Sequence, residues 1–353
     1  MEFGLTAEQA ELRDTVRSFL SRHATSARVR AAEGFDAGLW QRLTGELGVA
    51  ALAIGEEHGG FGASEVEVGL VLEEAGRVLL PAPYLATVTA AAAVDGELAA
   101  DLLAGIADGS TIATLALAEP GVGWTPENWA CTARRSGDGY LLDGVKEHVL
   151  DGQVADVAVV AAVCDAEPGL YAVRTSDARR TGYATLDPTR RQARLEFTAT
   201  PATLVGRRGV AHALDLLWAA LAVESVGVAR ASLELTIDYL KTREQFGVPL
   251  AHFQALRHRI ADLAVAVEAA TSSAWYALRV AGTAEFAVAA PVAKLVATRA
   301  AYAVTAESIQ LHGGIGFTWE HDAHLYLKRA TANQLLLGDE VALRRLIATR
   351  AGL

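Results

Sequence analysis

The middle part of the chain differs in sequence pattern from both ends, and this difference restricts the folds that the chain can adopt. Between about residues 111 and 206, short runs rich in β-branched and aliphatic residues are separated by Gly, Pro and Asp. Such runs, with no helical pattern between them, predict an antiparallel sandwich or barrel rather than βαβ units. A doubly wound dinucleotide-binding fold is therefore excluded. The runs are 112–117, 157–163, 171–173 and 193–197.

Both ends of the chain show helical periodicity. Near the N-terminus, Leu12, Val16 and Phe19 recur at spacings of three and four residues, which places them on one face of a helix. After residue 210 the periodic segments are long enough for an antiparallel four-helix bundle. In this part we expect helices at roughly 210–242, 252–281, 284–312 and 323–350.

These patterns predict an α+β fold of three domains in the order α–β–α. We expect an N-terminal helical domain over residues 1–110 and a middle antiparallel β-sandwich or barrel over residues 111–207. The C-terminal four-helix bundle then covers residues 208–353.

The composition excludes several classes of function. Hydrophobic residues make up 52% of the chain, yet no apolar run reaches the roughly 18–20 residues that span a bilayer. We therefore expect buried helices and subunit contacts, that is, a dimer or tetramer, rather than a membrane partner. The formal net charge of −11 argues against a nucleic-acid partner.

Cysteine and histidine usage predicts no disulfide framework and no metal site. The only cysteines, Cys131 and Cys164, lack the spacing of metal ligands. His321 and His324 lie beside acidic residues at a predicted helix start, where capping explains them better than a metal. Because the N-terminus also lacks the pattern of a secretory signal, we expect a cytoplasmic protein.

Two stretches in the C-terminal part carry the most specific motifs. The first, from Tyr239 to Gln254, reads YLKTREQFGVPLAHFQ, and the second, from Ser308 to Thr318, reads SIQLHGGIGFT. Together with Glu119-Pro120-Gly121 in the sheet region and the sequence EEHGGFG at 56–62, they resemble the acyl-CoA dehydrogenase family. The α–β–α order and the length agree with this resemblance, which covers nearly the whole chain.

The resemblance implies that FAD is bound between subunits. Residues at the motif positions suit this role, because Arg243 has a planar charged fork that matches a pyrophosphate and Phe246 has an aromatic face. Glycines at the second motif allow a ligand to approach the backbone closely. Taken singly, a charge at a helix end or a helix-ending turn explains each of these residues. The set that the resemblance implies for the ADP half of FAD is Arg243, Phe246, Gln254, Gln310, Gly313 and Gly314.

The position where most of the family has its catalytic glutamate holds a leucine here. The reaction needs a base for the α-proton of the thioester, and a buried carboxylate suits this task. Alignment on Gly338 places Leu337 at the base position, and a leucine cannot accept a proton. A second branch of the family takes its glutamate from the first C-terminal helix, near Leu217 or Trp218 here. The nearest carboxylates to these two positions are weak candidates for the base: Asp339, Glu340, Asp215 and Glu224.

The sheet region also departs from the family pattern. Ala118 and Leu150 stand where the family has hydroxyl side chains that hydrogen-bond the flavin edge, and Trp124 stands where a small serine is usual. The losses affect the base and the ring contacts, whereas the motifs for the ADP half are intact.

This asymmetry leads to one hypothesis and leaves two alternatives open. The chain is predicted to be the subunit of a heteromeric acyl-CoA dehydrogenase that contributes to FAD binding but lacks the base, as in family branches acting on sterol-derived acyl-CoA. Its expected partners are an acyl-CoA substrate, a catalytic sister subunit and an electron-transfer flavoprotein. The alternatives are an autonomous homo-oligomeric dehydrogenase with a relocated carboxylate base, and a flavin oxidase or monooxygenase on the same scaffold.

Overall fold

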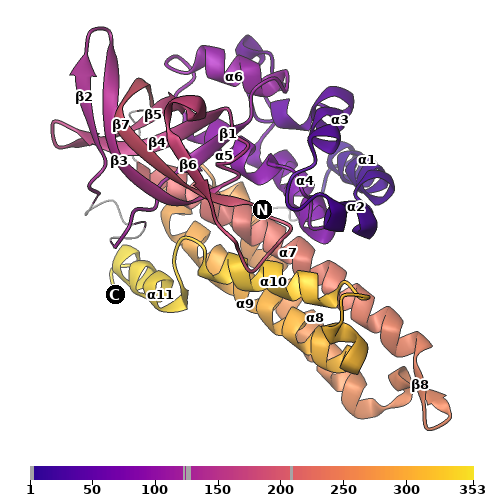
Figure 1. Cartoon of the computed structure of the whole chain (residues 1–353). Coiled ribbons are helices and arrows are strands. Elements are labelled where there is room, and N and C mark those ends of the chain that lie inside the picture. Colours follow the sequence, from indigo (N-terminus) through magenta and orange to yellow (C-terminus); the bar gives the residue numbers. More distant parts are fainter. Residues whose placement is uncertain (1–3, 122–123, 125–128, 207–209) are drawn as a thin grey trace. The chain divides into compact units, whose positions relative to one another are not determined.

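The structure is a computed structural model that describes residues 4–121, 124, 129–206 and 210–353. The described chain divides into two compact units (Figure 1). The helical unit contains residues 4–31, 69–80 and 218–353, and the barrel unit contains residues 32–68 and the described parts of 81–217. The helices α4 (Glu65–Arg77) and α7 (Val210–Thr242) each contribute to both units. The boundaries of the three predicted domains stay a prediction.

The helical unit contains the predicted C-terminal helices and the first helices of the chain. At its N-terminus Thr6 and Gln9 form a capping box, because the Thr6 side chain accepts from the Gln9 amide while the Gln9 side chain accepts from the Thr6 amide. Besides parts of α4 and α7, its helices are α1 (Ala7–His23), α2 (Ser26–Ala31), α8 (Gln254–Arg279), α9 (Phe286–His312), α10 (Ala323–Leu335) and α11 (Glu340–Arg350).

The predicted fourth helix at 323–350 is wrong in one respect, because it is divided into α10 and α11 (Figure 1). Leu337 and Gly338 between them have φ angles of 54° and 113°, which lie outside the helical region. Asp339 then caps α11, since its side chain accepts from the amide of Ala342. The helix is therefore interrupted at Gly338, and the capping Asp339 begins the next helix.

Two glycines bring α4 and α7 into backbone contact inside the helical unit. A Cβ atom added to Gly76 would lie 2.1 Å from the carbonyl oxygen of Glu224, and one added to Gly227 would lie 1.9 Å from that of Glu73. Either distance is far below van der Waals contact, so only glycine allows this approach of the two helices.

The barrel unit contains the predicted sheet, which closes into a barrel. The strand β3 (Gly139–Leu150) pairs with β2 (Thr132–Ser136) and β7 (Gln192–Gly206), and β5 (Glu167–Arg174) pairs with β7 and β4 (Val157–Cys164), all antiparallel. The partners Thr132 and Val163 join β2 to β4 and complete the ring. The prediction of a barrel is confirmed. The remaining strands are β1 (Ala113–Ala116) on β4 and β6 (Arg179–Gly182) on β7.

Two local features of the barrel bear on the predictions. The strands β2 and β3 are joined by a tight hairpin turn, in which Ser136 pairs with Gly139 across a two-residue loop whose Gly137 has a φ of 58°. The pairs β1–β4 and β2–β4 are parallel, unlike the rest of the barrel. Parallel pairing is possible here because the β2–β3 hairpin lies between β1 and β4 in the sequence.

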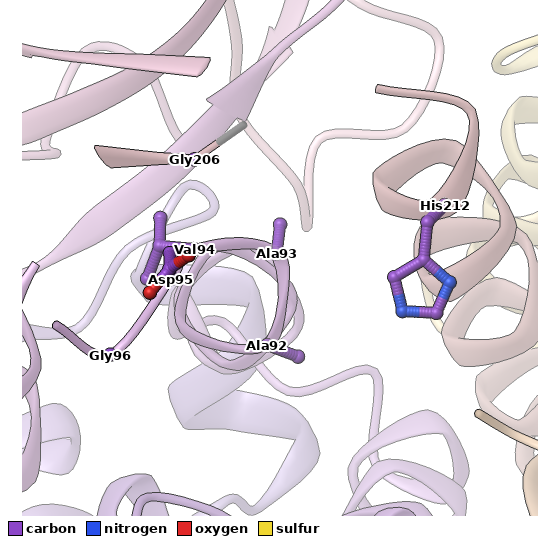
Figure 2. A pocket seen from close by; sticks show the side chains of 7 residues that line it. All are labelled: Ala92, Ala93, Val94, Asp95, Gly96, Gly206 and His212. Carbon is purple, nitrogen blue, oxygen red and sulfur yellow. The ribbon is translucent and has the colours of Figure 1, made fainter. Parts of the chain in front are cut away.

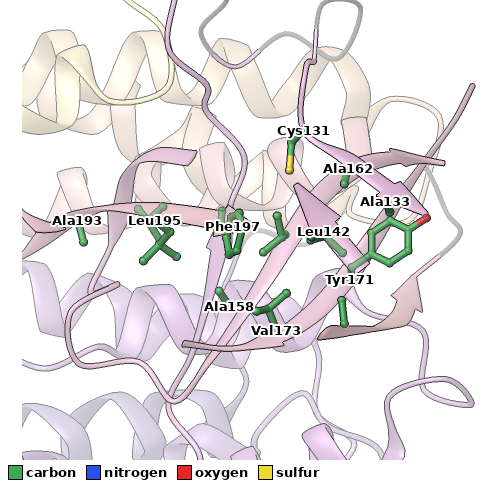
Figure 3. Packing of buried hydrophobic residues seen from close by; sticks show 14 residues of the cluster. Cys131, Ala133, Leu142, Ala158, Ala162, Tyr171, Val173, Ala193, Leu195 and Phe197 are labelled. Carbon is green, nitrogen blue, oxygen red and sulfur yellow. The ribbon is translucent and has the colours of Figure 1, made fainter. Parts of the chain in front are cut away.

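Small and aliphatic residues fill the barrel. Figure 3 shows this core, in which Leu142, Leu195 and Phe197 of the long strands meet Ala158 and Val173 of the facing pair. Three helices and two short helical turns in the same unit precede β1: α3 (Ala37–Leu47), α5 (Tyr84–Ala93), α6 (Ala100–Ala107), Val49–Ala51 and Glu56–His58.

Two helical segments are long and apolar enough to cross a membrane by length and composition alone. The apolar window of α7 is 89% buried inside the folded chain, and that of the segment Phe286–Phe317 is 56% buried. Core helices of folded domains pass the same test, and α7 is packed as such a helix.

Candidate functional site

The two C-terminal motifs meet at one end of the helical unit. The ring of Tyr239, near the end of α7, lies 4.4 Å from that of His312, the last residue of α9. One turn earlier, Thr236 donates a hydrogen bond of 2.7 Å to Ser308, 72 positions away in sequence. The packing of α7 on α9 therefore places the residues after each helix in one region.

Arg243 and Phe246 belong to a small hairpin that follows α7. Its strands are β8 (Glu244–Gln245) and β9 (Val248–Pro249), and the hairpin projects from the end of the helices in Figure 1. Phe246 and Gly247 have φ angles of 56° and 79°, as a two-residue turn of this kind requires. Phe246 is 92% exposed in this turn. The centroid of its ring lies 6.2 Å from that of Phe253, and the two rings are nearly perpendicular.

The guanidinium of Arg243, at the start of this hairpin, has no counter-charge among the described residues. Its backbone is held by hydrogen bonds from its own amide to Tyr239 and from Leu250 to its carbonyl, both 2.8 Å. Within the described parts of the chain, the side chain makes no ion pair or hydrogen bond, and the residue is exposed. An exposed, uncompensated arginine with a fixed backbone is suited to binding an anion such as a phosphate.

The remaining predicted residues lie on the same two segments. Gln254 is the first residue of α8 and Gln310 lies in the last turn of α9, and both are exposed. Gly313 has a φ of 62°, which favours glycine, and a Cβ added to Gly313 or Gly314 would meet no atom within 4 Å. Their backbone therefore faces open space that a ligand can reach.

A buried imidazole beside these glycines has an unused hydrogen-bonding atom. Burial lowers the pKa of His312, and its Nδ1 lies 2.7 Å from the carbonyl oxygen of Ser308. A neutral His312 thus donates from Nδ1, which leaves Nε2 as an acceptor that is buried and has no partner among the described residues. The exposed Arg243 and the open glycine backbone suit phosphate groups, whereas the unpaired acceptor of His312 suits a donor such as a hydroxyl of the same ligand.

Glu224, one of the candidate bases, is held by an ion pair. Its Oε1 accepts from Arg329 at 3.2 Å and its Oε2 from Asn333 at 3.1 Å. The side chains of Glu224 and Arg329 are 4% and 0% exposed. Both oxygens of this buried carboxylate thus already have donors within the chain.

Two further candidates have structural partners as well. Asp339 caps α11 through the amide of Ala342 at 2.9 Å, and Glu340 pairs with Arg344 at 2.8 Å and with Arg299 at 3.5 Å. Asp215 is 4% exposed and belongs to the barrel unit.

Leu337 lies in the loop between α10 and α11 and is 8% exposed. Its carbonyl oxygen accepts a hydrogen bond of 3.0 Å from Nε1 of Trp218. At the position that the resemblance assigns to the base, the chain thus has an aliphatic side chain, in a loop that a hydrogen bond from Trp218 stabilises.

In the barrel unit, the Glu-Pro-Gly motif has a structural role that the sequence analysis missed. Glu119 accepts from Lys146 at 2.6 Å and from the amides of Ala130 and Cys131, and Lys146 is 0% exposed. Ala118 and Leu150, which replace hydroxyl residues of the family, are both buried. Positions 122–123 and 125–128, on either side of Trp124, lie outside the described residues.

A hollow of about 230 Å³ adjoins the C-terminal end of α5 in the barrel unit. Figure 2 shows Asp95 and His212 on opposite sides of Ala93 in this hollow. Its lining has no candidate base from the sequence analysis, and it consists of Ala92, Ala93, Val94, Asp95, Gly96, Gly206 and His212. No group of three or more metal-ligating side chains occurs among residues 4–121, 124, 129–206 and 210–353.

Comparison with known proteins identifies the class of protein that this fold and site define. Residues 6–101 match the family described as "Acyl-CoA dehydrogenase, N-terminal domain", and residues 206–352 match "Acyl-CoA dehydrogenase, C-terminal domain". The chain is 38% identical over 346 residues to the acyl-CoA dehydrogenase IpdE2 of Mycobacterium tuberculosis, covering 96% of both chains.

Solved structures agree with these matches. One is the Tcur3481-Tcur3483 steroid ACAD G363A variant, with a TM-score of 0.92, 34% identity and 98% coverage of both chains. Another is the ChsE4-ChsE5 complex of Mycobacterium tuberculosis, with a TM-score of 0.91 and 26% identity, which covers 100% of this chain and 99% of that one.

This protein belongs to the acyl-CoA dehydrogenase family. It is an oxidoreductase of that family, and the family depends on FAD. The fold predicted from the sequence is confirmed by the structures of its relatives.

Proposed function

We propose that this chain is the subunit of a heteromeric acyl-CoA dehydrogenase that helps to bind FAD and provides no catalytic base. The observation that carries the proposal is Leu337, an aliphatic residue in a well-held loop at the family's base position, together with a free Arg243 at the end of α7. The reaction of the complex is the α,β-dehydrogenation of an acyl-CoA thioester, in which bound FAD accepts the hydride from the β-carbon.

The proposed binding residues each have a physical role toward FAD. Arg243 neutralises pyrophosphate charge, and Phe246 offers an aromatic face to the adenine or ribityl part. Gln254 and Gln310 can hydrogen-bond polar groups, and the backbone at Gly313 and Gly314 is open to close approach. His312 Nε2 is available to accept a hydrogen bond from a ligand hydroxyl.

A second subunit is supported by exposed aromatic residues in or directly after the same motif segments. Phe246, Phe317 and Trp319 are 92%, 84% and 67% exposed, which is unusual for such large apolar side chains. Two relatives are named as a two-component steroid ACAD and as the ChsE4-ChsE5 complex, which supports a catalytic sister subunit here. We expect a dimer or tetramer in the cytoplasm, with a bulky, steroid-like acyl-CoA as the substrate and an electron-transfer flavoprotein as the electron acceptor.

The first prediction concerns flavin content. The chain purified alone is expected to show little absorbance in the flavin band at about 450 nm, and the complex with its sister subunit is expected to show a full band. In the complex, Arg243→Met should release flavin, whereas Arg345→Met should not, because Arg345 is exposed and distant in sequence from both motifs. Full flavin occupancy and turnover of the chain alone would support the autonomous dehydrogenase instead.

The second prediction separates a partner's base from a relocated base in this chain. In the complex, Asp215→Asn, Asp339→Asn and Glu340→Gln should each change turnover by no more than about twofold, because general-base catalysis resides elsewhere. Loss of a true base lowers turnover by about 10²–10⁴-fold. A loss of that size for any one of these variants contradicts the proposal. Substrate-dependent oxygen uptake without an electron-transfer flavoprotein would favour the oxidase or monooxygenase alternative.

A further inference from the structure

The loop between α10 and α11 has a backbone conformation that needs support from outside the loop. Leu337 has a φ of 54°, in the left-handed region that side chains other than glycine avoid, and Gly338 follows with a φ of 113°. A conformation of this kind is unfavourable and persists only where surrounding contacts determine it.

Two buried side chains provide that support. Lys294, on α9, donates from Nζ to the carbonyl oxygen of Gln334 at 3.1 Å and to that of Gly338. Trp218, on α7, donates from Nε1 to the carbonyl oxygen of Leu337 at 3.0 Å. Both donors have side chains that are 0% exposed. The contacts of Lys294 thus lie on both sides of the bend, and that of Trp218 lies at its centre.

The amine of Lys294 is buried, and its charged form therefore loses solvation by water. Burial lowers its pKa to about 7, and the nearest carboxylate that opposes this shift is Asp339, which already caps α11. A methionine would fill a similar volume without this desolvation cost. The packing alone therefore does not explain a lysine at this position, whereas its two hydrogen bonds to the loop do.

We propose that Lys294 is the positioning residue of the α10–α11 loop and that, with Trp218, it sets the place of residue 337. Under the proposed function this place is the family's base position, so the chain retains the support of the base although the base itself is a leucine. The contacts involve only this chain's helical unit, so the proposal is tested without flavin, substrate or a partner.

Hydrogen–deuterium exchange of the full chain tests the proposal. The reporter amides are Leu336, Ala342 and Leu343, which donate to Ala332, to the Asp339 side chain and to the Asp339 carbonyl. Lys294→Met is expected to speed their exchange by at least about tenfold while the amides within α1 and α7 keep their rates. The control is Val16→Ala in α1, a fully buried site in the same unit, which should speed exchange in α1 and leave the loop unchanged.

Two further variants separate positioning from a general loss of stability. Lys294→Gln keeps a neutral amide donor and should restore part of the protection that Lys294→Met removes. Trp218→Phe keeps an aromatic ring but removes the Nε1 donor together with part of the buried indole, so it should loosen the same three amides, and it carries the test if Lys294→Met does not fold. The proposal is overturned if the loop amides exchange at the wild-type rate, or if exchange rises uniformly across all helices.

Discussion

Arg329→Met is expected to lower the free energy of unfolding by about 3–5 kcal/mol. Arg329 and Glu224 form an ion pair whose side chains are 0% and 4% exposed. Removal of the guanidinium leaves a carboxylate in the interior without its cationic partner, while Asn333 still donates to it at 3.1 Å. An uncompensated buried charge is among the most destabilising results of a single substitution.

The matching experiment uses the double variant Arg329→Met/Glu224→Leu. Replacing both members of a buried ion pair with apolar residues is often close to neutral, so the double variant should recover most of the lost stability. Urea unfolding of the isolated chain at neutral pH measures all three proteins. If the single variant loses less than about 1 kcal/mol, the pair is accessible to water and the assignment of Glu224 as a structural carboxylate is wrong.

Gly227→Ala is expected to destabilise the protein by at least about 2 kcal/mol, although alanine is the better helix former. The added Cβ would lie 1.9 Å from the carbonyl oxygen of Glu73, a backbone atom that cannot rotate away. Gly76→Ala should behave alike, since its Cβ would lie 2.1 Å from the carbonyl oxygen of Glu224. In both cases α4 and α7 must move apart.

Gly45→Ala is the control, because Gly45 lies in α3 and its Cβ would meet no atom within 4 Å. Here the helix propensity alone acts, and stability should rise by up to about 1 kcal/mol. Thermal or urea unfolding of the three variants shows opposite signs if the α4–α7 contact is as close as described. A stabilising effect at Gly227 would contradict that contact.

The two predictions together explain why the helical unit contains so many buried charges near one crossing. Glu73, Glu74 and Glu224 are all at most 8% exposed. Each pairs with an arginine: Glu73 with Arg230 at 3.4 Å, Glu74 with Arg17 at 2.6 Å and Glu224 with Arg329 at 3.2 Å. These pairs neutralise the carboxylates that the close approach of α4 and α7 draws into the interior.

Several features of this protein could be predicted from the amino-acid sequence because they depend on near neighbours. The order of helical and strand segments, the capping box at Thr6 and the turn before Gly139 follow from local patterns. The identity of Leu337 is also read directly, and with it the expectation that this chain lacks a base. Family membership was likewise evident from two short motifs.

Other features were decided only by the tertiary structure. The sequence left Glu224 among the candidate bases, and only the structure shows that it pairs with Arg329, 105 positions away. The donors that contact the loop between α10 and α11, Lys294 and Trp218, reach it from α9 and α7. In the sequence, Gly76 and Gly227 only lower the helix propensity of their segments. The structure shows that they allow α4 and α7 to approach each other closely. A local pattern determines which element forms, whereas the charge state and contacts of a buried side chain depend on residues that only folding brings near it.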